Sequence, residues 1–207
     1  MSNYRIVGAV LIIVSILVIG IARLLNPFHI ISGVGEKIKG DPNSPIEIVE
    51  FSDFQCGMCK DAQPLLEKLL DEFDGEVKLK FQHFPLNSHR HSILVHTCAE
   101  CADRQGKFWD FHDLLFDNQA KWSVQPQPLK NLMKYARELN FNMAKFEKCL
   151  TDSTVLKLIK AQKVKGKELG INQTPTFIVN KKVFIGIEQF ENMRSYIMSL
   201  SKKQRSE

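Results

Sequence analysis

The sequence has no acidic residue before Glu36, although Asp and Glu together number 23 among its 207 residues. It also lacks a skewed composition: 44% hydrophobic and 25% charged residues exclude a disordered chain and a collagen-like repeat. Five cysteines are too few for a small disulfide-dense protein, and a scattered net charge of +5 leaves no nucleic-acid footprint. One ordinary globular domain with an N-terminal appendage remains.

The acid-free tract contains a long apolar run. Residues 6–22, between Arg5 and Arg23, carry no charge and would span about 25 Å as a helix, or about 30 Å if Arg23 snorkels. We therefore predict a single-pass transmembrane anchor, a signal-anchor, within residues 1–25. The alternative is a cleaved signal peptide, for which residues 20–22 (Gly-Ile-Ala) offer suitably small side chains, although the run is long for one.

Beyond this tract, the pattern predicts two αβ segments separated by helices. A Pro/Gly-rich linker over residues 26–45 precedes a segment with one strand, one helix and one strand, followed by a wholly helical block over residues 88–169. Strand character then returns, followed by a C-terminal helix. The expected strands are 46–52, 77–83, 176–180 and 183–185, and the expected helices are 56–72, 90–104, 106–118, 126–140, 142–150, 152–169 and 188–200.

Two cysteines stand where the first strand meets its helix. Cys56 and Cys59 have the spacing i, i+3, so the first thiol is expected beside the free N–H groups of the helix N-terminus, which stabilise a thiolate. This arrangement predicts that Cys56 is a nucleophile and that Cys59 resolves its mixed disulfide. Half of a zinc site is the competing interpretation, but it requires a second pair of ligands.

A second motif, Thr174-Pro175-Thr176, stands directly before the predicted β-hairpin. A proline entering a central strand cannot donate to the sheet and is tolerated in a special turn, often with a cis peptide bond. A Thr-Pro pair alone is weak evidence. Its position more than a hundred residues after the two cysteines makes it a candidate part of the same site.

Together these motifs resemble the DsbA-like thiol:disulfide oxidoreductases, in particular their exported or membrane-tethered members. The resemblance covers residues 40–204, nearly all of the expected exported part. The matching stretches are GDPNSP (40–45), IVEFSDFQC (48–56), HFPL (83–86), CADRQGKFW (101–109), HDLLF (112–116) and GINQTPTF (170–177).

The resemblance implies an α/β thioredoxin-like fold, formed by residues 46–87 and 170–203, with residues 88–169 as an inserted all-helical domain. It implies dithiol-disulfide exchange through Cys56 and Cys59, with a cis bond before Pro175. It also matches Glu50 to the family's buried carboxylate, which could take the proton from Cys59; an exposed glutamate at a strand end is the alternative.

Two departures from the family pattern limit this inference. The dipeptide between the cysteines is Gly57-Met58, whereas the best-known strong oxidants carry Pro and His there. Without that histidine one stabiliser of the thiolate is missing, so we expect a less oxidising potential. Gln173 stands where the family has a small residue and could alter contacts with substrate.

The other three cysteines can pair in several ways on the sequence alone. Relatives of the family often carry a structural disulfide at the places of Cys101 and Cys149, which leaves Cys98 as a buried free thiol. A Cys98–Cys149 bridge is the competitor. The four histidines from His83 to His96 meet no standard metal spacing, so we expect neither a metal nor another cofactor.

The expected function is to introduce disulfide bonds into exported proteins. The expected partners are unfolded or reduced exported proteins, a quinone-linked membrane oxidoreductase that restores the Cys56–Cys59 disulfide, and the membrane itself. The catalytic domain would face the periplasm or the extracellular side, or be released there after signal cleavage. Two alternatives stay open: a reductase or isomerase of the same fold, and a metal-transfer chaperone with Met58 as a ligand.

Overall fold

The computed structural model describes residues 36–206 of the chain. The predicted transmembrane segment and the first part of the predicted linker lie outside the described residues. Among residues 36–206, no helix has both the length and the apolar character needed to cross a membrane.

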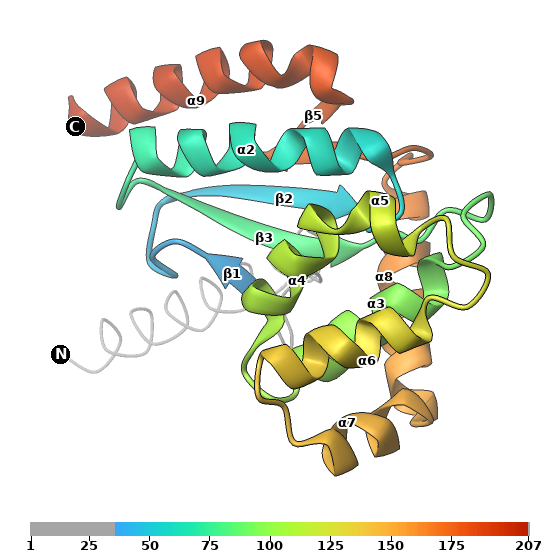
Figure 1. Cartoon of the computed structure of the whole chain (residues 1–207). Helices are drawn as coiled ribbons and strands as arrows, with labels where there is room; N and C mark the ends of the chain where they lie inside the picture. The colour runs from blue at the N-terminus through green and yellow to red at the C-terminus, as the bar shows by residue number, and fades with distance from the viewer. Residues whose placement is uncertain (1–35, 207) are drawn as a thin grey trace, which may run out of the picture. The chain divides into compact units, whose positions relative to one another are not determined.

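Five strands form one mixed sheet in the order β1-β3-β2-β4-β5 (Figure 1). β2 and β3 are parallel and are connected by a helix, whereas the three other neighbouring pairs are antiparallel. β2 is therefore central, so its C-terminal end lies in the middle of one sheet edge. The strands are β1 (Lys37–Lys39), β2 (Ile46–Ser52), β3 (Val77–His83), β4 (Thr176–Val179) and β5 (Lys182–Ile185).

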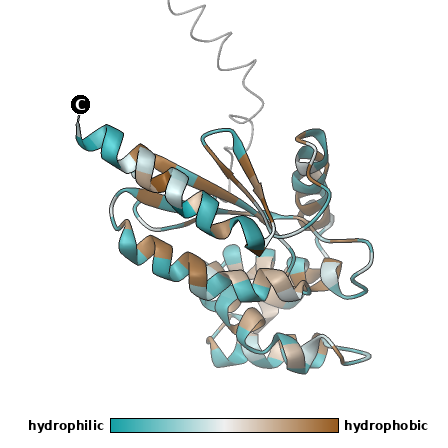
Figure 2. Ribbon diagram, turned by 90° about the horizontal axis from the view of Figure 1, so that it is seen from above, coloured by the Kyte–Doolittle hydropathy of each residue, from teal (hydrophilic) through white to brown (hydrophobic). Residues whose placement is uncertain are grey.

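Two helices cover one face of the sheet. α2 (Gly57–Glu72) and α9 (Phe190–Arg205) lie side by side there, and a 3-10 turn, η2 (Ile187–Gln189), precedes α9 (Figure 1). α2 buries Cys59, Ala62, Leu66 and Leu69, which recur at helical spacing and form one apolar stripe against the sheet. Figure 2 shows the same contrast by hydropathy, with mostly hydrophobic strands beneath helices whose outer sides are hydrophilic.

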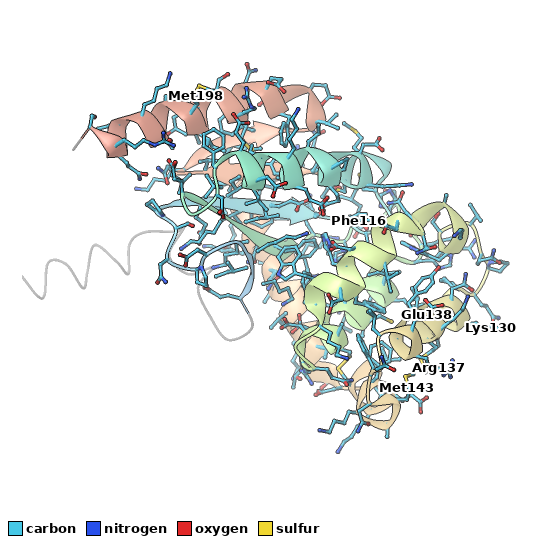
Figure 3. The ribbon with its side chains drawn as sticks, turned by 60° about the vertical axis from the view of Figure 1, so that its left-hand side comes forward. Phe116, Lys130, Arg137, Glu138, Met143 and Met198 are labelled. Atoms are coloured by element: carbon cyan, nitrogen blue, oxygen red, sulfur yellow. A yellow bond between two sulfur atoms is a disulfide. The ribbon has the colours of Figure 1, made fainter. Side chains whose placement is uncertain are left out.

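A block of helices occupies the other side of the sheet (Figure 1). Its buried residues form one core with Phe54, Phe81, Cys56 and Cys59. α6 shows how the block is oriented, because Lys130, Arg137 and Glu138 are exposed on it (Figure 3) while Leu132, Tyr135 and Ala136 are buried. The helices are α3 (Ser92–Asp103), α4 (Phe108–Asp117), α5 (Gln119–Trp122), α6 (Leu129–Glu138), α7 (Met143–Leu150) and α8 (Ser153–Glu168).

The predicted arrangement of two αβ segments flanking a helical block is confirmed, with three differences in detail. Lys37–Lys39, assigned above to the linker, form β1 and pair with β3. Three residues with two lysines show no apolar alternation, and the burial of Lys37 is made tolerable by its ion pairs with Glu100 and Asp103. The structure also adds the four-residue α5, and its last helix begins at Phe190 and continues to Arg205.

Candidate active site

The two cysteines lie at the N-terminus of α2. Cys56 is the N-cap residue and is 8% exposed, whereas Cys59, one turn into the helix, is fully buried. Both are free thiols in this structure. The central strand β2 ends at Ser52, so only three residues separate the sheet from the first sulfur atom.

The surroundings of Cys56 favour its thiolate. The Cys59 thiol donates a hydrogen bond to its sulfur, as do the backbone N–H groups of Met58 and Cys59, and together they lower the pKa of Cys56 from 9.0 to about 6 against the opposing effect of burial. A thiol with that pKa is mostly ionised at neutral pH. Cys56 therefore has the character of an attacking, and equally of a leaving, sulfur.

Cys59 has the opposite character. Burial raises its pKa well above 9.0, and the neighbouring Cys56 and Glu50 raise it further. Its sulfur accepts a hydrogen bond from the backbone N–H of Asp53 at 3.5 Å. A Cys59 thiolate released by reduction must therefore gain a proton inside the protein.

Glu50 lies behind the cysteine pair and is fully buried. Burial raises the pKa of its carboxyl group from 4.5 to about 7, so this group can hold or release a proton near neutral pH. The side-chain amide of Gln63 donates to Glu50 Oε1 at 3.2 Å and to the Cys59 carbonyl at 2.9 Å. The sequence left the burial of Glu50 open, and the structure places it inside.

The Thr174–Pro175 loop meets the first cysteine from the far end of the chain. The peptide bond between the two residues is cis. The Cys56 thiol donates to the Thr174 carbonyl oxygen at 3.4 Å, across 118 residues of sequence. The backbone N–H of Gly186 donates to the Pro175 carbonyl at 2.9 Å, which ties this loop to the end of β5.

Asp53 supports the same turn and was not singled out in the sequence. Its buried carboxylate accepts hydrogen bonds from the backbone N–H groups of Gln55 at 2.8 Å and Leu86 at 2.7 Å, and contacts His89 Nδ1 at 2.9 Å. Its own carbonyl accepts from the Cys56 N–H at 2.9 Å. The available signal was an acidic residue directly after a buried strand and three positions before a cysteine.

Gln119 links the helical block to the active site and was also missed. Its side-chain amide donates to the carbonyl oxygens of Phe54 and Cys56, each at 2.8 Å, and the residue is buried. Both hydrogens of the amide are thus used on the turn that carries the nucleophile. A glutamine in a helical pattern gives no hint of such a contact.

Comparison with known proteins agrees with this geometry. A family model described as thioredoxin matches residues 33–199, which is most of the chain. The chain belongs to the thioredoxin family. Its structure is similar to that of Wolbachia pipientis alpha-DsbA1, with a TM-score of 0.73 and 22% identity over 83% of this chain and 94% of that one.

Other solved structures show the same likeness within the thioredoxin family. BdbD from Bacillus subtilis has a TM-score of 0.69 and 24% identity, covering 80% of this chain and 92% of its own. The catalytic domain of Proteus mirabilis ScsC has a TM-score of 0.66 and 20% identity, covering 86% and 92%. The chain thus has a thioredoxin-like fold with a helical insertion, of the DsbA-like type.

The curated relatives of this thioredoxin-family chain are longer proteins. The Na(+)/H(+) antiporter NhaA 3 of Salinispora tropica is 31% identical over 166 residues, which cover 79% of this chain and 24% of the antiporter. A Salinispora arenicola antiporter, NhaA 1, shows the same identity and coverage. The chain spans about a quarter of the length of these relatives.

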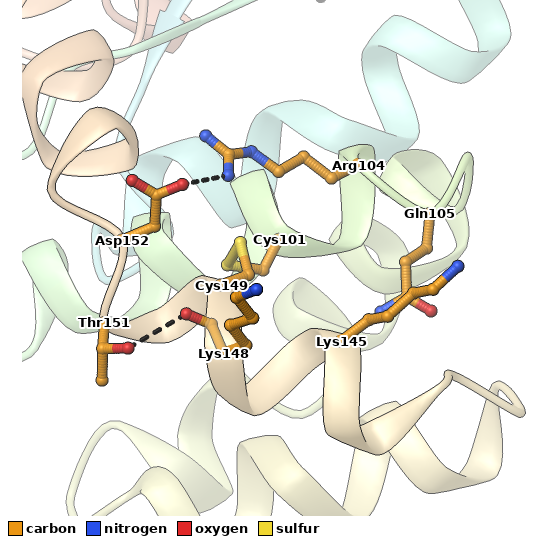
Figure 4. A pocket seen from close by; sticks show the side chains of 8 residues that line it. All are labelled: Cys101, Arg104, Gln105, Lys145, Lys148, Cys149, Thr151 and Asp152. Atoms are coloured by element: carbon orange, nitrogen blue, oxygen red, sulfur yellow. Dashed lines mark hydrogen bonds and ion pairs between the residues drawn. A yellow bond between two sulfur atoms is a disulfide. The ribbon is translucent and has the colours of Figure 1, made fainter.

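Away from the cysteine pair, the thioredoxin-family chain carries one disulfide within the described residues. It joins Cys101 on α3 to Cys149 on α7, the pairing that the family resemblance implied. An open pocket of about 440 Å³ lies over it (Figure 4), lined also by Arg104, Gln105, Lys145, Lys148, Thr151 and Asp152. The pocket does not include Cys56 or Cys59, so it is separate from the cysteine pair at the start of α2.

The last cysteine and the histidines are accounted for inside the thioredoxin-family core. Cys98 is a fully buried free thiol, and burial raises its pKa to about 12, so it is inert as a nucleophile. His83 and His96 contact each other, and His89 contacts Asp53. Within residues 36–206, no group of three or more His, Cys, Asp or Glu side chains has an arrangement that could hold a metal ion.

Proposed function

We propose that this protein is a thiol:disulfide oxidoreductase that introduces disulfide bonds into reduced exported proteins. The observation that carries this proposal is the asymmetry of the cysteine pair. Cys56 keeps 8% of its surface exposed and has a pKa of about 6, whereas Cys59 is fully buried and its pKa is raised. One sulfur is therefore suited to meet a substrate and the other to close or open the bond from within.

In the reaction, a substrate thiolate attacks Cys56 Sγ of the oxidised pair. The Cys56–Cys59 bond breaks, and Cys59 leaves with the electron pair and takes up a proton. A second substrate thiolate then attacks the substrate sulfur of the mixed disulfide and releases the Cys56 thiolate. The substrate has lost two electrons and gained a disulfide, and the protein has gained both electrons.

The same asymmetry supports the oxidising direction. A pKa of about 6 leaves about nine-tenths of Cys56 as thiolate at pH 7, whereas an ordinary thiol is about one per cent ionised there. Stabilising the thiolate stabilises the reduced form, and a protein whose reduced form is stable gives up its disulfide readily. The effect arises without a histidine between the cysteines, because the α2 N–H groups and the Cys59 thiol supply it.

Glu50 serves as the proton acceptor and donor for Cys59 in this proposal. Its pKa of about 7 allows it to be protonated in one step and ionised in the next. Gln63 supports this role because it binds the carboxylate and the Cys59 backbone with one amide group. Glu50 would thus protonate Cys59 when the disulfide opens and take the proton back during reoxidation.

We further propose that the apolar segment within residues 1–25 anchors the protein as a single-pass membrane protein. The uncharged run over residues 6–22 supports this proposal, and disulfide chemistry requires an oxidising compartment. The catalytic domain would then face the periplasm or the extracellular side. A quinone-linked membrane oxidoreductase would accept the two electrons from Cys56 and Cys59.

A trapping experiment tests the exchange reaction. In the full-length Cys59→Ala variant, the Cys56 thiolate can still attack a disulfide of an exported protein and release one of its two sulfurs as a thiolate. No Cys59 thiol is present to break the resulting bond, so mixed disulfides between Cys56 and exported proteins should accumulate on non-reducing gels. Cys56→Ala should trap nothing, and Cys98→Ala, which removes a buried thiol outside the pair, should behave as wild type. If Cys59→Ala traps no more than Cys56→Ala, the proposed reaction is wrong.

The direction of exchange is tested by the potential of the pair. The equilibrium constant between Cys56–Cys59 and glutathione should lie on the oxidising side of that of a thioredoxin-type reductase, whose potential is about −270 mV. A potential of the Cys56–Cys59 pair at or below about −270 mV would refute the oxidase proposal and would indicate a reductase instead.

A further inference from the structure

A chain of buried polar side chains runs from the active-site turn to the edge of the sheet. His96 Nε2 lies 3.7 Å from Asp53 Oδ1, and its Nδ1 lies 2.6 Å from His83 Nδ1. His83 Nε2 lies 3.2 Å from Glu100 Oε2, and the same oxygen is 2.7 Å from Lys37 Nζ. None of the five side chains is more than 5% exposed.

The contacts of the two imidazoles require three protons. One must lie between the two Nδ1 atoms, because two unprotonated nitrogens would repel each other at 2.6 Å. His83 Nε2 lies within hydrogen-bond distance of Glu100 Oε2 and needs a proton. His96 Nε2 has no hydrogen-bond partner but faces the Asp53 carboxylate at 3.7 Å, where an unprotonated nitrogen would be repelled, so it needs a proton as well. Two neutral imidazoles carry only two protons. The pair therefore lacks one proton unless one ring is an imidazolium.

Asp53 is ionised at one end of this chain. Although burial opposes ionisation, the hydrogen bond from His89 and the contact with His96 hold the pKa of Asp53 well below its ordinary value. The backbone N–H groups of Gln55 and Leu86 also point at its oxygens and leave no room for a proton. At the other end, the ammonium group of Lys37 binds Glu100.

We propose that the His83–His96 pair carries one imidazolium charge, centred on His96, and that the resulting array fixes the turn carrying Cys56 and Cys59. Burial and the positive charges of His96 and Lys37 lower the pKa of His83, so the charge lies on the ring that faces Asp53. The array then alternates in sign: Asp53 negative, the imidazole pair positive, Glu100 negative and Lys37 positive. Its charges cancel, which makes the burial of four ionised groups tolerable. The effect of this array on disulfide exchange rests on the proposed function. The number of protons on the two histidines does not depend on it.

The array reaches the thiols through Asp53. The Asp53 N–H binds Cys59 Sγ at 3.5 Å, and its carbonyl accepts from the Cys56 N–H at 2.9 Å. A rotation of this residue would move both contacts at once. Asp53, His83 and His96 are therefore positioning residues, because they act on the reacting sulfurs through the backbone and through their charge.

Other charged groups face the array from each element packed on it. His89, in the loop before α3, pairs with Asp53, and Asp103 on α3 lies 3.5 Å from Lys37. Lys163 on α8 has an electrostatic contact with Asp53. On α4, His112 packs against Phe81, beside the array, and its own imidazole is paired with Asp113 instead.

The proton count can be measured in the wild-type protein. Nuclear magnetic resonance of the reduced protein with ¹⁵N-labelled histidine should show three protonated ring nitrogens for the His83–His96 pair. Two protonated nitrogens at about pH 7 would overturn the proposal, whatever the activity of the protein.

Paired variants test the effect on the thiols. In His96→Gln, the Asp53 charge keeps only His89 as an ion-pair partner. The Cys56 thiolate should therefore be less stable, and the equilibrium constant with glutathione should shift to the reducing side by on the order of tenfold. In Asp53→Asn, the imidazolium is left without its partner, so the shift should have the opposite sign. His112→Gln, a buried histidine outside the array, should match wild type.

Opposite signs distinguish a charged array from a merely structural one. If the role is merely structural, the equilibrium constants of both variants with glutathione should shift in the same direction, or both should equal that of His112→Gln. Either result would overturn the proposal. Circular dichroism of each variant serves as the control for folding. If wild type itself exchanges no disulfide with glutathione, the proposed function fails, while the resonance measurement still decides the proton count.

Discussion

Replacing Glu50 with glutamine should remove a pH dependence of stability. The pKa of this buried carboxyl is about 7 in the folded protein against an ordinary 4.5, and each pKa unit corresponds to about 1.4 kcal/mol. The folded state therefore binds the proton more tightly than the unfolded state. Its contribution to stability, about 3 kcal/mol, is complete below about pH 4.5 and is lost as the pH rises through about 7.

The measurement is urea unfolding of the reduced protein at several pH values. Cys56 contributes in the opposite sense at higher pH, because its folded pKa is lowered, so the informative quantity is the difference between Glu50→Gln and wild type. That difference should change by about 3 kcal/mol between about pH 4 and about pH 8 in favour of the variant. Glu47→Gln, on the same strand but only partly buried, is the matched control.

A difference that is flat with pH, or equal to that of the control, would refute the reasoning. It would mean that Glu50 is solvated or ionised throughout, and it would remove its assignment as the proton acceptor for Cys59.

Three further outcomes are expected. The rate of alkylation of Cys56 by iodoacetamide should rise with pH with a midpoint near 6. A midpoint near 9 would show that the helix N-terminus does not stabilise the thiolate. Removing the Cys101–Cys149 bridge by double substitution with alanine should lower the free energy of unfolding by about 4 kcal/mol, because it closes a loop of 48 residues; a loss below about 1 kcal/mol would contradict the loop-entropy argument. In Gly166→Ala, the new Cβ would lie 2.7 Å from the buried ring of Phe84, so the free energy of unfolding should fall by about 1 to 3 kcal/mol, measured by thermal unfolding. Val164→Ala, at an exposed site on the same helix, should change the free energy of unfolding little, and an equal loss in both variants would contradict the steric argument.

The sequence predicts the parts of this fold that depend on local pattern. β2 spans residues 46–52 as expected, because an apolar run bounded by Pro45 and Asp53 leaves little choice of ends. The placement of Cys56 at a helix N-terminus follows from the same strand-to-helix transition. The five long helices of the insertion were recognisable from their 3.6-residue periodicity, with ends shifted by only a few residues.

What the sequence does not predict depends on contacts between distant segments. β1 becomes a strand because β3 offers it an edge, and Lys37 can be buried because Glu100 and Asp103 on α3 pair with it. The side of the sheet on which Glu50 lies is decided by register, so its burial could not be settled from its own neighbours. The His83–His96 contact joins the end of a strand to a helix, and no spacing rule anticipates it.

The two hydrogen bonds from Gln119 have a consequence for how the molecule opens. Helix α5 has only four residues and cannot persist alone, so it is held in place by its tertiary contacts. Because its glutamine binds the carbonyls of Phe54 and Cys56, local unfolding of α5 and loosening of the cysteine turn belong to one cooperative unit. The helical insertion therefore influences how often the cysteine turn opens. A fluctuation that unfolds α5 also loosens the turn that carries Cys56, and a change that rigidifies the helical block should slow the opening of α5 and of this turn together.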